Sequence, residues 1–184
     1  LKDLEKKGNN SIAPHFYSDL LKVKFDKELG KFNQLKFHPI GTKDASGKQY
    51  SNPVLKNKGW EDFLIISPFV DDKTLDRIAA ISGKKRYLLS RKEELDSLCL
   101  ESISKFNCFQ FSKLIEQAEL NDELNEDDAD SMLQNLHAKL FITQIEDKVH
   151  WFLGSANCTD PAQERNIEFI VELKGNISHG VKPK

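Results

Sequence analysis

Four polar side chains of complementary chemistry lie at two-residue spacing in the last third of the chain. His137 and Lys139 are separated by one residue, and Ser155 and Asn157 belong to the tetrapeptide Gly-Ser-Ala-Asn. An imidazole titrates near neutrality and can act as a nucleophile or as an acid and base. An ammonium, a hydroxyl and a carboxamide can bind the non-bridging oxygens of a phosphate. The set points to a site that holds and attacks a phosphate.

Both pairs lie on segments whose composition predicts β-strands. Residues 137–144 and 149–156 are largely apolar and flank the turn-like sequence Ile-Glu-Asp-Lys, which predicts a hairpin. Alternate residues of a strand point to the same side, so the members of each pair are expected to project together. The hairpin would then place one pair beside the other.

A third predicted strand, residues 166–174, carries Glu168 near its start. A carboxylate close to His137 would fix the tautomer of the imidazole and raise its basicity. Taken singly, each of these residues has an ordinary explanation, such as a surface position on a strand or a turn at Gly-Ser-Ala-Asn. The combination in this order favours a functional site.

The stretches "HAKLFI", "GSANCT" and "NIEF" resemble the phospholipase D superfamily, whose motif is H-x-K, four residues, Asp, six residues and Gly-Ser-x-Asn. The resemblance covers roughly residues 60–173, and the wording is most similar to bacterial nuclease-like members found in defence or helicase-associated proteins. It implies an α/β unit that hydrolyses phosphodiesters without a metal or other cofactor. In that family one His attacks phosphorus to form a phosphohistidine, a second His protonates the leaving group, and water releases the product.

The resemblance assigns a role to each candidate residue. His137 would be the nucleophile or the acid, Lys139 would serve catalysis and phosphate binding, Ser155 and Asn157 would bind phosphate, and Glu168 would be the supporting catalytic carboxylate. Nucleic acid is the expected substrate, which makes the chain a nuclease. Two alternatives stay open: a phospholipid substrate, and a non-catalytic half that binds nucleic acid or completes the fold of a larger protein.

Two features depart from the family pattern. Gln144 occupies the position of the motif's Asp, and Asn157 follows His137 by 20 residues instead of 17, which a longer hairpin containing Asp147 would explain. The tyrosyl-DNA phosphodiesterase branch of the superfamily also lacks this Asp. No other His is followed by Lys two places later, so the chain supplies one half of a two-histidine site.

The second half is expected from a homodimer partner or from an upstream region of the same protein. Residues 1–59 show no clear pattern and are interpreted as an arm or linker, possibly the end of an upstream unit. The missing initial Met favours the upstream source. Residues 60–184 are interpreted as one phospholipase D-like domain with a single H-x-K…G-S-x-N motif.

The elements before the motif alternate between strand and helix patterns. Together with the late strands, this order predicts an α/β fold, a mixed β-sheet flanked by helices. The expected elements are a strand at 62–70, a helix capped by Asp71 or Asp72, a strand at 85–90, a helix opened by a capping box at Ser90–Glu93, and a strand at 108–111.

The bulk composition excludes several classes of protein. With 184 residues, 39% of them hydrophobic, the chain can build one domain with a core, and no apolar run is long enough to span a membrane. Three scattered cysteines suit a reducing compartment, which predicts a cytoplasmic protein, and their spacing does not predict a zinc site. The net charge of −2 does not indicate a general nucleic-acid binder.

Three local features have weaker implications. The basic residues between Lys84 and Lys92 are either a phosphate contact or a solvated face. Ser67-Pro68-Phe69 ends a predicted strand, where ligand crevices of α/β proteins often lie. Residues 119–130 contain seven acids and predict a solvated loop.

Overall fold

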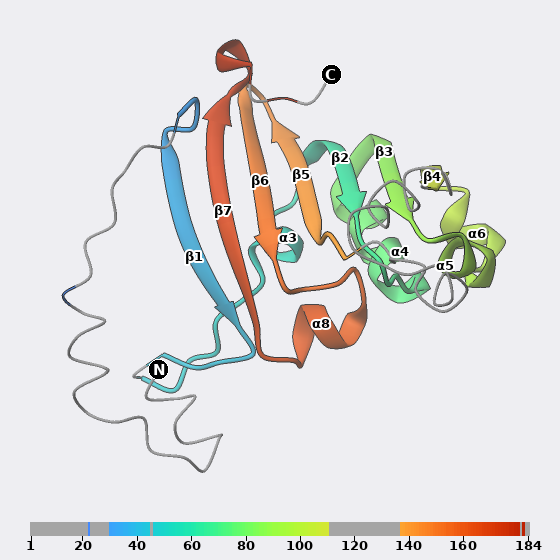
Figure 1. The fold of residues 1–184 in the computed structure, drawn as a ribbon, viewed down its shortest axis with the longest axis horizontal. Helices are drawn as coiled ribbons and strands as arrows, with labels where there is room; N and C mark the ends of the chain where they lie inside the picture. The colour runs from blue at the N-terminus through green and yellow to red at the C-terminus, as the bar shows by residue number, and fades with distance from the viewer. Residues whose placement is uncertain (1–21, 23–29, 45, 111–136, 181, 183–184) are drawn as a thin grey trace, which may run out of the picture.

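A seven-stranded mixed sheet forms the centre of the molecule (Figure 1). The computed structural model describes residues 22, 30–44, 46–110, 137–180 and 182. The strand order is β1-β7-β6-β5-β2-β3-β4. The strands are β1 (Gln34–Ile40), β2 (Trp60–Ile66), β3 (Ser82–Ser90), β4 (Asn107–Gln110), β5 (Leu140–Ile145), β6 (Lys148–Gly154) and β7 (Glu168–Asn176).

The sheet consists of a parallel and an antiparallel part. Strands β2, β3 and β4 are parallel, whereas β5, β6, β7 and β1 continue the sheet from β2 with antiparallel pairings. Parallel neighbours need a crossover connection, and helices supply it between β2 and β3 and between β3 and β4. The predicted α/β fold with a mixed sheet is confirmed.

Helices pack against one face of the sheet and enclose the core. They are α3 (Pro53–Lys56), α4 (Asp72–Ile81), α5 (Lys92–Ser97), α6 (Leu100–Ile103) and α8 (Asp160–Glu164), and a 3₁₀ turn, η2 (Ile177–His179), follows β7. Asp71 caps α4 by accepting a hydrogen bond from the amide of Thr74 at 2.8 Å, as predicted. The largest buried core side chains are Trp60, Phe63, Phe141 and Phe152.

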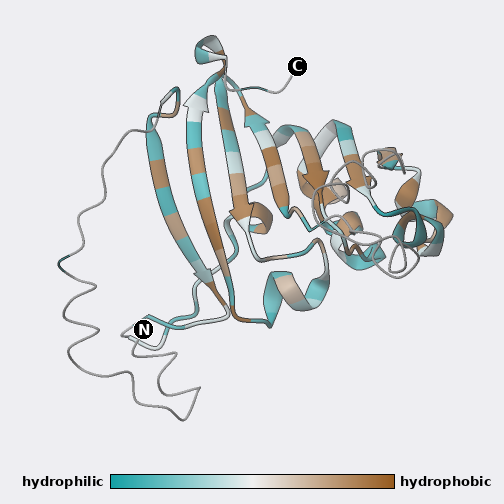
Figure 2. Cartoon of the chain, in the orientation of Figure 1, coloured by the Kyte–Doolittle hydropathy of each residue, from teal (hydrophilic) through white to brown (hydrophobic). Residues whose placement is uncertain are grey.

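The second face of the sheet is also rich in apolar residues. Hydrophobic residues concentrate on β2 and β5, whereas β1 alternates between hydrophilic and hydrophobic positions (Figure 2). Phe37 and Phe169 stack on this second face with ring centroids 5.6 Å apart and are about half exposed. The structure therefore separates a helix-covered core face from an apolar face that the described helices leave open.

The helix predicted after Ser90 begins differently. Ser90 is not the N-cap: its fully buried hydroxyl donates to the carbonyl of Ser67 at 2.7 Å, and α5 begins after Arg91 without a side-chain cap. The predicted continuous helix is two short ones, because Leu98 has an extended backbone with ψ of 149°. The capping-box prediction was wrong because the Ser90 hydroxyl makes a tertiary hydrogen bond to Ser67, just after β2, and does not cap the helix.

Part of the predicted arm belongs to the sheet. Strand β1 pairs with β7 along its whole length, and Val54 of α3 is fully buried in the core. Strand β1 and helix α3 therefore pack with the domain that was predicted to begin at residue 60. The reason is non-local: the partner of β1 lies about 130 residues later in the chain, beyond any local sequence signal.

Two other expectations fall partly or wholly outside the described residues. One is that residues 1–59 are the end of an upstream unit, since residues 1–21 and 23–29 are not described. The other is the solvated loop at 119–130. Within the described part, no helix is long and apolar enough to cross a lipid bilayer.

Candidate active site

The predicted site segments lie together at one end of the strands, which is called the sheet edge below. The end of β2 lies beside the start of β5 through the Ile66–Leu140 pair, and the end of β6 lies beside the start of β7 through the Gly154–Ile170 pair. In Figure 1 this edge is the lower one, where the arrowheads of β2 and β6 point and where α8 lies. Segments that precede β5 and β7 and follow β2 and β6 therefore meet there.

The H-x-K segment lies just before β5, not within it. Residues 137–139 precede the strand, which begins at Leu140, so the predicted strand alternation does not orient His137 and Lys139. The side chain of Lys139 donates to the carbonyl of His137 at 2.9 Å instead. His137 is exposed and Lys139 is half-buried. The histidine is thus accessible at the sheet edge.

The predicted meeting of the two motif halves is present in the backbone. The amide of Gly154 donates to the carbonyl of Lys139 at 3.3 Å. This bond extends the β5–β6 pairing by one step and places the H-x-K segment against the start of Gly-Ser-Ala-Asn. The hairpin turn is at Glu146 and Asp147, as predicted, with Glu146 in the left-handed region at a φ of 51°.

Ser155 and Glu168 are in direct contact. The Ser155 hydroxyl donates to a carboxylate oxygen of Glu168 and accepts from the amide of Phe169 at 3.0 Å. The other Glu168 oxygen accepts from the Asn166 carboxamide at 3.3 Å. Glu168 was predicted to orient His137, but its hydrogen bonds among the described residues orient Ser155. Its position at the site edge is as expected, while its partner is different.

Asn157 has unused hydrogen-bonding capacity. Its backbone carbonyl accepts from the Gln163 side chain at 2.6 Å, whereas its Oδ1 is buried without a partner in the described part of the chain. Buried polar atoms are nearly always paired, so this carboxamide keeps a hydrogen-bonding group that a ligand could use. The carboxamide can present either its oxygen or its N–H₂ group by a half-turn.

Ser67 is a positioning residue that the sequence analysis did not identify as one. It is fully buried at the end of β2, and its hydroxyl accepts from the amide of Cys158 at 2.9 Å and donates to the carbonyl of Phe69 at 2.7 Å. Val70 also pairs with Cys158 as an isolated parallel bridge. The segment after β2 thereby fixes the residue that follows Asn157. The available signal was a lone serine at the end of an apolar strand, since a buried hydroxyl needs partners.

Gln163 holds the same loop from the other side. Its side chain is almost fully buried, donates to Asn157 and accepts from the carboxamide of Asn52, which also caps α3. Neither residue carried a sequence signal, because Asn52 and Gln163 lie 111 positions apart.

The position of the motif's Asp lies at the far end of the hairpin. Gln144 is near the end of β5, donates to the carbonyl of Glu146 at 3.0 Å and accepts from Lys182 at 2.5 Å. Asp147 lies in the turn and pairs with Lys148 at 2.9 Å. Because His137 precedes the start of β5, neither side chain lies at the same end of the hairpin as the histidine.

The predicted basic cluster has mainly structural contacts. Arg86 donates to the carbonyls of Ala79, Gly83 and Lys105, and Lys92 pairs with Asp96 on α5. Arg91 differs, because its guanidinium carbon lies 4.6 Å from the ring centroid of Phe69. The cluster is therefore not one phosphate-binding surface.

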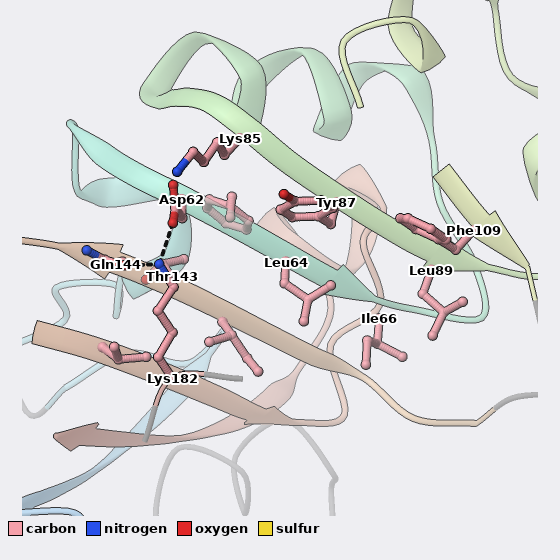
Figure 3. Close-up of a pocket in the computed structure, with 13 residues that line it drawn as sticks. Asp62, Leu64, Ile66, Lys85, Tyr87, Leu89, Phe109, Thr143, Gln144 and Lys182 are labelled. Carbon is pink, nitrogen blue, oxygen red and sulfur yellow. Dashed lines mark hydrogen bonds and ion pairs between the residues drawn. The ribbon is translucent and has the colours of Figure 1, made fainter. Parts of the chain in front are cut away.

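A cavity of about 540 Å³ lies on the open face of the sheet. Figure 3 shows Leu64, Ile66 and Leu89 on one side of it, with Tyr87 and Phe109 beside them, while Lys182 pairs with Asp62 at its polar end. Its largely apolar lining does not suit a phosphate, and the predicted residues lie at the sheet edge instead. We therefore assign the candidate active site by chemistry and not by cavity size.

The chemistry of cysteines and metals is limited in the described residues. All three cysteines are free thiols, and burial raises the pKa of Cys158 far above its usual range, with the Asp71 carboxylate adding to the rise. This thiol beside Asn157 is therefore inert. In the described ranges, no group of three or more His, Cys, Asp or Glu side chains could hold a metal ion.

A mixed sheet with an H-x-K segment hydrogen-bonded to a G-S-x-N segment is the arrangement that the resemblance to the phospholipase D superfamily predicted. Among solved structures, the chain is similar to the yeast tyrosyl-DNA phosphodiesterase, with a TM-score of 0.50 and 10% identity over 76% of this chain. It covers 31% of that protein, so it spans about a third of its length. This likeness supports the fold that the motifs predicted.

Two bacterial proteins show weaker likeness. Nuc from Salmonella typhimurium, described as a phospholipase D family member, gives a TM-score of 0.41 and 12% identity over 79% of this chain and 85% of its own. NucT from Helicobacter pylori gives a TM-score of 0.36 and 18% identity over 61% of this chain and 68% of its own. No family model matches the sequence, and a search of curated proteins finds no similar chain.

Proposed function

We propose that this chain is one half of a metal-independent phosphodiesterase that acts on nucleic acid. One observation carries the proposal: the 3.3 Å bond from Gly154 to Lys139 joins the H-x-K and G-S-x-N segments at one sheet edge. The fold shared with the yeast tyrosyl-DNA phosphodiesterase supports it. The free cysteines agree with a cytoplasmic site of action.

His137 is the nucleophile in this proposal. A ring nitrogen attacks phosphorus, a P–N bond forms, and the P–O bond to the leaving group breaks. A histidine from the second half-site gives its proton to the leaving oxygen. Water then attacks the phosphohistidine, the same second histidine takes the water's proton, and the P–N bond breaks to free His137 and the phosphate product.

Three other side chains hold the phosphate. Lys139 gives a positive charge, Ser155 a hydroxyl and Asn157 a carboxamide toward the non-bridging oxygens. The Lys139 ammonium donates one hydrogen bond to the His137 carbonyl, and its two other N–H groups can donate to phosphate oxygens. Glu168 holds the Ser155 hydroxyl in place and acts as the supporting carboxylate.

The experiment is hydrolysis in excess EDTA. The substrates are a small phosphodiester, labelled single- and double-stranded DNA, and phosphatidylcholine vesicles, which test the lipid alternative. His137→Ala should lower the rate by about 10³-fold or more, as loss of a nucleophile does. His179→Ala changes an exposed histidine in η2 and is the matched control. Turnover that persists in His137→Ala contradicts the proposal.

A non-catalytic half is the second candidate. The observation in its favour is Gln144, which replaces the motif's Asp and is bonded at the far end of the hairpin. This candidate predicts nucleic-acid binding without turnover, and binding that survives His137→Ala.

A further inference from the structure

An exposed aromatic ring stands beside the phosphate-binding loop. Phe69 follows β2 and is 41% exposed, although its neighbour Val70 is buried. Val70 bridges to Cys158, the residue after Asn157. Ser155 is three residues from Cys158, a span of at most about 11 Å. A nucleotide next to a phosphate bound at Ser155 can therefore reach the ring.

The ring is held on a rigid segment. The carbonyl of Phe69 accepts from the buried Ser67 hydroxyl at 2.7 Å, and the amide of Val70 donates to Glu94 at 3.2 Å. The same Ser67 hydroxyl accepts from the amide of Cys158. One hydroxyl thus ties the backbone of the aromatic residue to the backbone of the G-S-x-N loop.

A guanidinium extends the aromatic surface. The Arg91 Cζ lies 4.6 Å from the Phe69 centroid, and the parallel pairing of β2 with β3 brings the two residues together. Aromatic rings and guanidinium planes both stack on unpaired bases, with cation–π attraction between them. In a duplex each base face is covered by its neighbours, so such a surface favours a single strand.

We propose that Phe69 and Arg91 form a base-stacking subsite for a single-stranded nucleic acid whose phosphate is bound by Lys139, Ser155 and Asn157. The inference rests on the proposed function, since it names the substrate class of the same site. Arg91 supplies both a plane and a positive charge, whereas Phe69 supplies apolar area that a phosphate cannot use. The two contributions are separable by experiment.

The test compares the binding of two labelled 12-mers by fluorescence anisotropy, one of thymidylate and one of abasic residues with the same charge. Phe69→Ala should raise the Kd for thymidylate about 10-fold and leave the abasic strand unchanged, because stacking is lost and charge is kept. Phe69→Trp should restore the affinity. Phe37→Ala, which removes a half-exposed ring on β1, is the matched control and should have no effect.

Other outcomes overturn the subsite. These are an unchanged Kd in Phe69→Ala, an equal loss on both strands, and a wild-type protein that does not prefer thymidylate to the abasic strand. His137-dependent hydrolysis of the small phosphodiester in EDTA is measured on the same preparations. If that hydrolysis is present without a stacking effect, only the subsite fails. If hydrolysis is absent but the stacking effect is present, the catalytic proposal fails and the binding surface stands.

Discussion

At the scale of single residues, the structure changes the role of one carboxylate. Glu168 was expected to orient the histidine, yet its two oxygens bond to Ser155 and Asn166. A hydroxyl that donates to a carboxylate keeps its lone pairs for other donors, and one of them already accepts from Phe169. In the proposed mechanism, Ser155 therefore exchanges its hydrogen bond to Glu168 for one to a phosphate oxygen when substrate binds.

This exchange predicts different effects for two substitutions. Ser155→Ala removes a phosphate donor and should lower kcat/KM about 10- to 100-fold, through both KM and kcat. Glu168→Gln keeps the shape of the side chain but holds the Ser155 hydroxyl less firmly. The loss of kcat/KM should therefore be smaller and mainly in kcat. The measurement is steady-state hydrolysis of the small phosphodiester. Equal and complete losses for both variants would instead favour a direct catalytic role for Glu168.

Ser67 offers a test of positioning. Ser67→Ala removes the acceptor for the buried Cys158 amide and leaves the carbonyl of Phe69 without its donor. We expect a loss of about 1–3 kcal/mol in unfolding free energy, as for an unsatisfied buried group. In addition, kcat should fall while KM changes little, because the loop that carries Asn157 is displaced. Ser46→Ala, in an exposed turn, is the control.

At the scale of elements, a carboxylate with two histidine partners links three strands of the sheet. Glu172 of β7 accepts hydrogen bonds at 2.7 Å from His38 of β1 and from His150 of β6. Burial alone would raise the pKa of Glu172, but the two histidines outweigh it and lower the pKa to about 2. The edge strand β1 is therefore held by a charge contact as well as by its ladder.

The lowered pKa predicts how stability depends on pH. The folded value lies below the usual value of 4.5, so the ionised Glu172 carboxylate stabilises the protein above about pH 4.5 and stops doing so as the pH falls towards 2. The contribution is on the order of 3 kcal/mol. Urea unfolding of wild type and Glu172→Gln should differ by this amount near neutrality and converge towards pH 2. Glu93→Gln is the exposed control, and a difference that does not vary with pH would contradict the role of the Glu172 carboxylate.

Gly154 shows a second element-scale constraint. The motif glycine has no room for a side chain, because an added Cβ would lie 2.0 Å from the carbonyl oxygen of Phe169 on β7. Gly154→Ala should therefore destabilise the protein by about 2 kcal/mol or more. Gly47→Ala, with open space but a φ of 85°, should cost only about 1 kcal/mol. Chemical denaturation distinguishes the two.

At the scale of the whole molecule, the chain contains one H-x-K segment, so the proposed two-histidine mechanism needs a second half-site. The homodimer version of the proposal predicts that activity follows dimer content. The rate per chain should rise with protein concentration, in parallel with the mass from light scattering. A fully formed dimer without turnover would contradict this version and favour an upstream second half or the non-catalytic candidate.

The sequence by itself determined the local features of this protein. Strand and helix patterns follow from apolar periodicity, and the hairpin follows from two apolar runs around a turn, so β2, α4 and the β5–β6 pair were predictable. The motif residues were also predictable, because their types and spacing carry the chemistry. Their arrival at one sheet edge followed from the hairpin.

Only the tertiary structure decided the contacts between distant segments. The pairing of β1 with β7, the bond from Ser67 to the loop after Asn157, and the stack of Arg91 on Phe69 join residues from 22 to 140 positions apart. The choice of Ser155 as the partner of Glu168 depends on the register of β6 against β7. Hydrogen bonds and side-chain packing act over a few ångströms in space, whereas sequence patterns report only neighbours along the chain. The residues proposed to attack and hold a phosphate therefore came from the sequence alone, while the residues that contact and position their segments were visible only in the fold.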